Sequence, residues 1–182
     1  MQSIDMREEE KALSLSVVSA QDEGLLVQEE EAIRHFALEG ILPPGHLLAL
    51  HRPLGILVDL VRSGEEPRML ASQQFTFSEL CVLLPLLEAY PHYCPYEVLL
   101  AYFTSASESV DRERVEQCRL HLHRSLMEGM FEQEMRPVRN VISRTRLKLH
   151  LFGVDVISLL ETGYLLRKMP QRPRKPRAKP AE

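Results

Sequence analysis

Apolar residues in the second quarter of the chain fall into short segments of strand length. Three of them, residues 46–52, 55–62 and 67–72, are separated by a Pro-Leu-Gly and a Ser-Gly-Glu-Glu-Pro sequence. Short apolar segments between turn residues are typical of adjacent antiparallel strands, so the pattern predicts a small sheet. Before them, residues 29–41 have apolar side chains at helical spacing, and we expect a short helix that ends at Gly40.

From residue 76 onward the apolar spacing becomes that of helices. Thr76 and Glu79 form a T-x-x-E capping box ahead of the apolar residues 77–90, which indicates the start of a helix. Pro85 lies inside this segment and is expected to kink or interrupt the helix, because proline lacks the backbone N–H. Residues 94–103 predict a second helix with a proline in its first turn.

The remaining chain predicts two more helices and a hairpin. Residues 111–134 have an amphipathic pattern, and the apolar stripe consists of Val115, Cys118, Leu122, Leu126 and Met130. A fourth helix is expected to begin at Pro137, run to about His150 and stop at Gly153. The apolar segments on either side of residues 161–163 are then expected to pair as a β-hairpin.

The fourth helix is basic on one side. At 100° per residue, five residues share a narrow arc that we expect to be buried: Val138, Val141, Ile142, Thr145 and Leu149. The opposite face and one flank carry polar and basic residues: Arg139, Asn140, Ser143, Arg146 and His150, then Arg144 and Lys148. A helix fits the DNA major groove, where Arg and Asn pair with base edges while flanking cations hold phosphates. An ordinary surface helix with solvated charges is the alternative.

Charge divides the chain into acidic and basic parts, although its formal net charge is only −4. Residues 1–40 hold 3 Lys/Arg and 10 Asp/Glu, residues 41–135 hold 7 and 13, and residues 136–182 hold 12 and 3. A basic last quarter is typical of a nucleic-acid surface or of an interaction tail. The proline-rich basic end of the chain either adds salt-sensitive phosphate affinity or is simply a solvated terminus.

From about Leu47 to Arg167, the order sheet, helix, helix, basic helix and hairpin resembles the DNA-binding domain of OmpR/PhoB-type response regulators. The segment PVRNVISRTRLKL resembles that family's recognition helix, V-x-x-x-I-x-R-x-R-x-x-L, and VDVISLLETGYLL resembles its wing, which ends in G-x-G-Y. The resemblance implies an α+β winged helix with an N-terminal antiparallel sheet, a helical core, a long inserted helix and a C-terminal hairpin wing. We expect that domain at 46–168, after a partly disordered acidic segment at 1–45 and before a disordered basic tail at 169–182.

Three departures from the family pattern bear on function. Leu160 stands where the family's wing has an arginine that reaches the minor groove, and Glu161 beside it would repel phosphates. Leu147 lies on the groove-facing side of the basic helix, where it could contact a thymine methyl or mark a protein contact. About 30 residues, 104–135, replace the short loop that contacts RNA polymerase in the family.

The inserted helix, about residues 107–134, has two interpretations. It packs on the domain's own core, or it forms a surface for RNA polymerase, another protein or a second copy of the chain. About 46 residues precede the predicted sheet, against the ~100 or more that a phosphoacceptor receiver domain needs. We therefore expect no control through such a receiver domain.

The resemblance implies a sequence-specific transcription regulator that binds double-stranded DNA, with a homodimer or tandem pair on two half-sites. The residues expected to contact DNA are Arg136, Arg139, Asn140, Ser143, Arg144, Arg146, Lys148, Arg167 and Lys168. The alternative is a winged helix that has become a protein-interaction module and lost specific DNA binding. Four features favour that alternative: Leu160 in the wing, Leu147 on the groove-facing side, the negative net charge of the chain and the added helix.

Other chemistry has little support in the sequence. No G-x-S-x-G, P-loop or G-x-G-x-x-G motif occurs, so we expect no enzyme activity, no catalytic residues and no cofactor. Cys118, His121 and His123 do not share one helix face and no C-x-x-C pair accompanies them, so we expect no metal. The apolar runs are shorter than the ~20 residues of a membrane span, and the acidic N-terminus lacks signal-peptide features. These features predict a cytoplasmic protein, and the DNA binding that the resemblance implies would make it nucleoid-associated.

Overall fold

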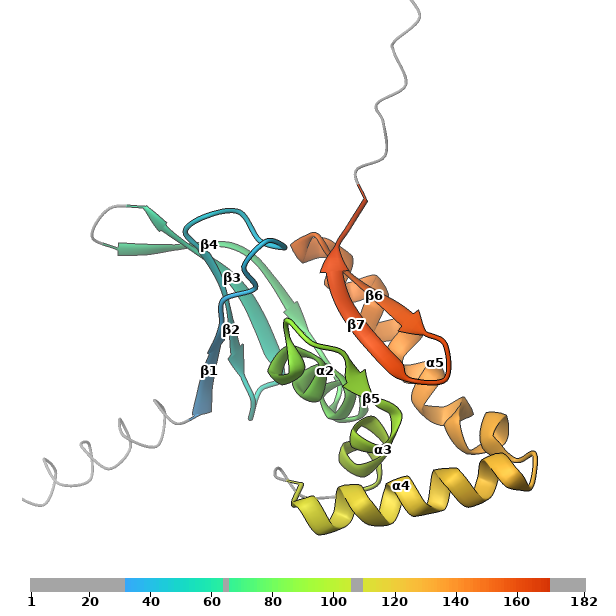
Figure 1. Cartoon of the computed structure of the whole chain (residues 1–182). Coiled ribbons are helices and arrows are strands. Elements are labelled where there is room, and N and C mark those ends of the chain that lie inside the picture. Colours follow the sequence, from blue (N-terminus) through green and yellow to red (C-terminus); the bar gives the residue numbers. More distant parts are fainter. Residues whose placement is uncertain (1–31, 64–65, 106–109, 171–182) are drawn as a thin grey trace, which may run out of the picture.

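The computed structural model describes residues 32–63, 66–105 and 110–170. In this part of the chain a four-stranded sheet, four α-helices and a three-stranded sheet are arranged around a shared hydrophobic core (Figure 1). Both sheets are antiparallel. The predicted α+β class is therefore confirmed.

The larger sheet has the strand order β1-β2-β3-β4. Its strands are β1 (Ile33–Phe36), β2 (His46–His51), β3 (Ile56–Ser63) and β4 (Glu66–Gln74). The last three correspond to the three apolar segments in which the sequence predicted strands, and that prediction is confirmed. Their turn sequences and apolar residues are sufficient to place them, because each strand pairs with its neighbour in the chain.

The short helix predicted over residues 29–41 is wrong from Ile33 onward. Residues 33–36 are instead strand β1, whose backbone pairs with residues 48–51 of β2. Residues 29–31 lie outside the described part of the chain. Tertiary pairing outweighs a weak helix preference here, because the backbone groups of residues 33–36 pair with those of β2. The loop after β1 adds three residues to the core: Leu38, Ile41 and Leu42. The folded unit thus begins before residue 46.

The capping box predicted at the start of α2 (Phe77–Ala89) is present. The Thr76 hydroxyl accepts a hydrogen bond from the Glu79 backbone N–H at 3.4 Å, and the Glu79 carboxylate accepts one from the Thr76 N–H at 2.8 Å. The helix is continuous through Pro85, so the predicted interruption does not occur. Helix α3 (Tyr96–Thr104) follows with Pro95 at its N-cap, one position before the first turn.

The Thr76→Ala variant is expected to lower the free energy of unfolding by about 1 kcal/mol, because it removes the acceptor for a helix-terminal N–H. Thr76→Ser keeps a hydroxyl at the cap and is expected to stay within about 0.5 kcal/mol of the native chain. Urea denaturation followed by circular dichroism measures both values. Equal losses in the two variants would show that the methyl group, and not the cap, matters.

The amphipathic pattern over residues 111–134 is divided between two helices, so the inserted helix predicted to reach residue 134 is too long. Helix α4 (Arg112–Met127) begins at an Asp111 N-cap and ends at a turn in which Gly129 has a φ of +71°. Glycine adopts this left-handed backbone conformation without steric cost, which explains the break. Helix α5 (Phe131–Leu149) therefore starts six residues before the predicted start at Pro137. Leu126 and Met130, predicted on the apolar stripe, are 59% and 40% exposed.

The C-terminal hairpin is present as predicted. Its strands are β6 (Val154–Leu159) and β7 (Gly163–Lys168), and it follows the short 3-10 helix η1 (His150–Phe152). Strand β5 (Cys94–Pro95) pairs with β7 and completes a sheet of order β5-β7-β6. A Cβ atom on Gly163 would lie 2.1 Å from the Cys94 carbonyl oxygen, so only glycine allows this close approach.

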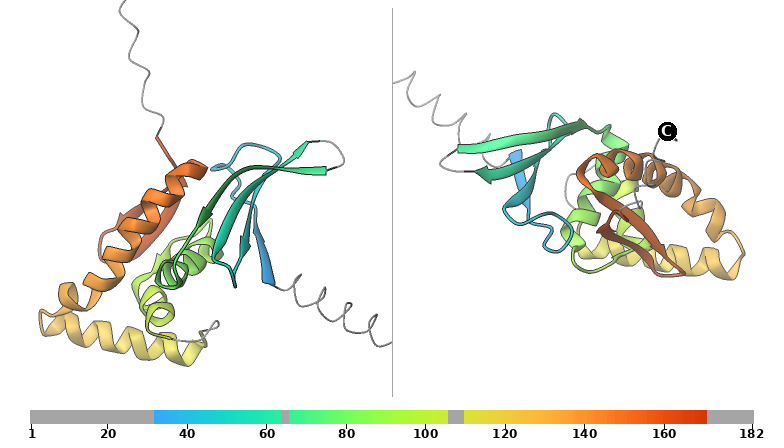
Figure 2. Two further views of the ribbon diagram at one scale, coloured as in Figure 1. Left: turned by 180° about the vertical axis from the view of Figure 1, so that it is seen from behind. Right: turned by 90° about the horizontal axis from the view of Figure 1, so that it is seen from above.

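Helix α2 lies centrally, in contact with α3 and α5, and separates the larger sheet from the hairpin (Figure 1). Helix α4 lies along one end of the molecule and contacts α3. Seen from behind, α5 runs along the outer side of the molecule with the β6–β7 hairpin next to it (Figure 2). One side of α5 thus faces the core, and the opposite side is open.

Candidate nucleic-acid interface

Helix α5 buries the stripe that its sequence predicts. The five residues of the expected arc are all at most 4% exposed: Val138, Val141, Ile142, Thr145 and Leu149. The stripe packs on α2, α3 and β6, which fixes the rotation of the helix about its axis. The opposite side exposes a row of residues at helical spacing: Arg136, Asn140, Ser143, Arg144 and Leu147. The predicted buried face is therefore confirmed. Of the residues predicted on the opposite face, Asn140, Ser143 and Arg146 are exposed, whereas Arg139 and His150 are only partly exposed.

Asp155 of β6 is the centre of a buried charge cluster that ties α5 to the hairpin. Its carboxylate accepts hydrogen bonds from Arg146 at 2.6 Å and from Arg167 at 3.0 and 3.1 Å. The Val156 backbone N–H donates at 3.0 Å, and His150 Nε2 lies 3.3 Å away. The Asp155 side chain is only 3% exposed, whereas the two arginine side chains are 45% and 46% exposed.

The charge state of Asp155 follows from these neighbours. Burial opposes its ionisation, but the hydrogen bonds from Arg146, Arg167 and His150 outweigh that effect and lower the pKa of Asp155 to about 2. The carboxylate is therefore ionised at neutral pH and offsets one of the two arginine charges.

The Asp155 cluster makes stability depend on pH in acid. Because the folded-state pKa is about 2 and the ordinary value is 3.8, the stabilisation is present above pH 3.8 and is lost as the pH falls toward 2. We expect the stability advantage of the native chain over Asp155→Asn to shrink by about 2 kcal/mol between about pH 5 and pH 2. Urea titrations of both chains across this range measure it. A constant difference would contradict an ionised, stabilising Asp155.

Lys148 is also held by an internal partner. Its ammonium group lies 2.6 Å from the Glu79 carboxylate and 3.0 Å from the Gln74 carbonyl oxygen, and 5.3 Å from the centre of the Phe75 ring. Burial raises the pKa of Glu79, but the bonds from Lys148 and Thr76 outweigh it, so the net pKa is below the ordinary value. This ion pair connects the end of α5 to the start of α2.

Arg139, near the middle of α5, is held by two residues at the start of the same helix. It forms an ion pair with Glu132, and its guanidinium lies 5.9 Å from the centre of the Phe131 ring. Phe131 in turn packs edge-on against Tyr96, with ring centres 5.5 Å apart. Arg139 therefore stabilises the corner where α5 begins, rather than projecting from the outer face.

The structure thus divides the nine predicted DNA-contacting residues into two groups. Four have carboxylate partners within the fold: Arg139, Arg146, Lys148 and Arg167. Five lie on the surface, and among the described residues none of them has a carboxylate partner: Arg136, Asn140, Ser143, Arg144 and Lys168. Asp155 and Glu79 were not predicted as partners of these cations. The available signal was a lone carboxylate in each of two otherwise apolar segments, VDVISL and FSELCVLL.

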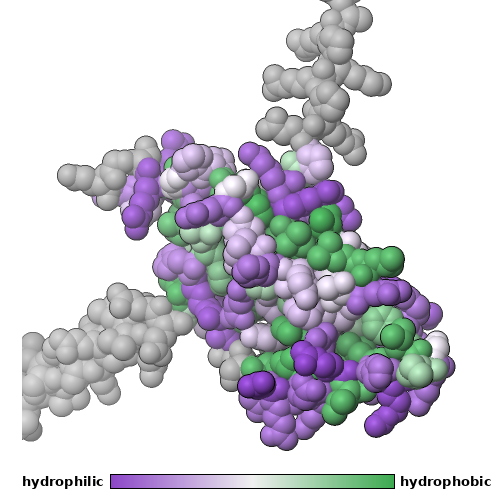
Figure 3. Space-filling view, viewed as in Figure 1, coloured by the Kyte–Doolittle hydropathy of each residue, from purple (hydrophilic) through white to green (hydrophobic). Residues whose placement is uncertain are grey.

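Apolar side chains lie beside these exposed cations. Leu147 on α5 is 70% exposed, Leu151 of η1 is 56% exposed, and Leu160 at the hairpin tip is 87% exposed. Figure 3 shows hydrophobic residues gathered over the region of the β6–β7 hairpin, between purple patches. The surface around α5 is therefore mixed, with cations and leucines side by side.

Helix α4 packs on the fold through three buried residues, Cys118, Leu122 and Ser125. Cys118 and Leu122 are buried, and α4 contacts α3 and α5, which supports the interpretation that it packs on its own core. Its last turn exposes Leu126 and Met127. His121 is hydrogen-bonded to Glu134 at 3.1 Å. Within the described residues no three His, Cys, Asp or Glu side chains converge as metal ligands would.

Comparisons of the chain with models of protein families, with curated proteins and with solved structures find no significant match. In the part of the chain that the structure describes, no helix is both long and apolar enough to cross a membrane.

Proposed function

We propose that this chain is a DNA-binding transcription regulator of the winged-helix class, with α5 as the recognition helix and β6–β7 as the wing. The observation that carries the proposal is the outer face of α5. Arg136, Asn140, Ser143 and Arg144 lie there in one exposed row, on a helix that the core packing holds rigidly. These are side chains that donate to guanine and adenine edges and to phosphates.

The shape of this region is compatible with a DNA groove. Helix α5 has 19 residues, or roughly 28 Å at 1.5 Å per residue, and its outer side is uncovered (Figure 2). The Asp155 cluster holds the hairpin next to the helix, so both elements would meet the duplex together. The half-exposed Arg146 and Arg167 carry two positive charges against one carboxylate, and the remaining charge would favour phosphates near the edge of the groove.

The proposal is tested by selecting sequences from a random double-stranded DNA pool and measuring binding by fluorescence anisotropy across a salt series. The full chain and a chain ending at residue 170 are compared, since the last twelve residues carry five Lys/Arg and one Glu. Both chains are expected to enrich one recurring sequence. For the shorter chain, a plot of the logarithm of the binding constant against the logarithm of the salt concentration should have a slope of about −3. Binding that disappears with the tail, and no enriched sequence, would contradict the proposal.

A second candidate is a winged helix that binds a protein through the same face. The exposed leucines of α5, η1 and the hairpin tip favour it, because Leu147 and Leu160 stand where a DNA-reading surface would carry polar or basic residues. Four of the predicted DNA-binding cations are also paired internally. Under this alternative, the shorter chain enriches no sequence and binds DNA weakly at every salt concentration.

A further inference from the structure

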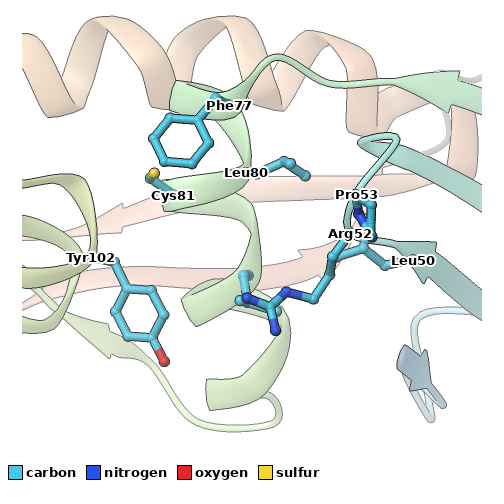
Figure 4. Close-up of a pocket in the computed structure, with 8 residues that line it drawn as sticks. Leu50, Arg52, Pro53, Phe77, Leu80, Cys81 and Tyr102 are labelled. Carbon is cyan, nitrogen blue, oxygen red and sulfur yellow. The ribbon is translucent and has the colours of Figure 1, made fainter. Parts of the chain in front are cut away.

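An apolar groove lies on the side of α2 that faces α3 and the β2–β3 turn, away from α5 (Figure 4). It has a volume of about 180 Å³ and is lined mainly by apolar side chains: Leu50, Pro53, Phe77, Leu80, Cys81 and Leu84, with Arg52 and Tyr102 at its edges. The groove plays no part in the proposed DNA interface.

The groove is open, and its rim is unusually apolar for a surface. Phe77, the first residue of α2, is 67% exposed, and Leu54 in the neighbouring turn is 57% exposed. An exposed phenylalanine beside an apolar groove offers a large surface that is stabilised when another apolar group covers it.

The described part of the chain begins next to this groove, at Ala32. The Ala32 carbonyl oxygen accepts a hydrogen bond from the backbone N–H of Arg52 at 3.1 Å, and Ile33 pairs with His51. Arg52 and Pro53 line the groove, so Ala32, the first described residue, is hydrogen-bonded to the groove's lining. Whatever immediately precedes Ala32 is tethered there at high local concentration.

The residues that precede this point have complementary chemistry. Leu25, Leu26 and Val27 are the nearest strongly apolar side chains, and only four residues separate Val27 from Ala32. An extended chain of that length spans up to roughly 17 Å, enough to cross a groove of this size. The three glutamates at 29–31 would lie next to Arg52, which adds charge complementarity.

We propose that Leu25–Val27 dock in this groove and cover Phe77, so that the acidic N-terminal segment is held against the fold between β2 and α2. The apolar side chains fill the groove, and the glutamates that follow them lie along its cationic edge. The segment is thereby held on the α3 side of α2, away from α5. The groove is then an intrachain binding site for the N-terminal segment.

Cys81 lines the groove and provides a direct test. In a Leu26→Cys variant treated with oxidised glutathione, docking predicts rapid formation of a disulfide between residues 26 and 81 within one chain. The matched control carries Leu26→Cys together with Leu25→Asp and Val27→Asp. This control keeps the tether length and removes the apolar contacts, and its cross-linking should be at least about tenfold slower. Cys81→Ser should abolish the product, which peptide mass mapping identifies.

A second measurement uses Cys81 in a chain without an added cysteine. Alkylation of Cys81 by a maleimide should be at least about tenfold faster after Leu25→Asp and Leu26→Asp than in the native chain, while circular dichroism stays unchanged. Equal cross-linking rates in the variant and its matched control, with equal alkylation rates, would overturn the proposal. A disulfide that joins two chains would also overturn it, because it would assign the groove to a second copy.

Discussion

Alanine at both Arg136 and Arg144 is expected to weaken binding to the selected DNA sequence about 30-fold or more. These two side chains lie on the outer face of α5, and no carboxylate among the described residues pairs with them. Each good arginine–base contact contributes about 1–3 kcal/mol of discrimination, so the removal of both arginines corresponds to at least this factor. Fluorescence anisotropy at fixed salt measures the change, and the chain should remain fully folded because neither side chain enters the core.

The matched control is Arg112→Ala with Arg124→Ala. It removes the same two charges from exposed positions of α4, away from the outer face of α5. We expect it to change DNA affinity by no more than about threefold, because these charges act on DNA only through the long-range electrostatic field of the protein. If both double variants lose affinity equally, binding depends on total charge and α5 does not recognise the sequence.

Asp155→Ala is expected to lower the free energy of unfolding by about 2–4 kcal/mol at neutral pH. The substitution removes a buried acceptor that serves two arginines, a histidine and a backbone N–H, and leaves the arginines without their partner. The loss is smaller than for a fully buried pair, because Arg146 and Arg167 are nearly half exposed and water can solvate them. Urea denaturation gives the value.

Glu161→Gln is the control for the loss of negative charge from the same hairpin. Glu161 is exposed in the turn, and its replacement should change stability by no more than about 0.5 kcal/mol. A loss for Asp155→Ala no larger than that of this control would mean that the cluster does not hold the hairpin to α5. DNA affinity of Asp155→Ala should also fall, since the hairpin would no longer be fixed beside the helix.

Local features of the fold were predictable because they depend on residues close in the chain. The capping box at Thr76, the turns between β2, β3 and β4 and the hairpin all follow from residue types within a few positions of one another. The helix predicted over residues 29–41 failed for the opposite reason. Residues 33–36 of this segment pair with strand β2, and the helix preference of a short segment carries no information about such a partner.

For the candidate site, the sequence by itself determined which face of α5 is buried, because apolar residues at helical spacing must turn toward the core. It also determined the existence of a basic outer face. Only the tertiary structure decided which cations remain available on that face. Lys148 meets Glu79, 69 positions earlier in the chain, and Arg146 meets Asp155 across the start of the hairpin. Such pairs form when packing brings opposite charges together away from water, and a pattern along one helix does not encode the distance between elements.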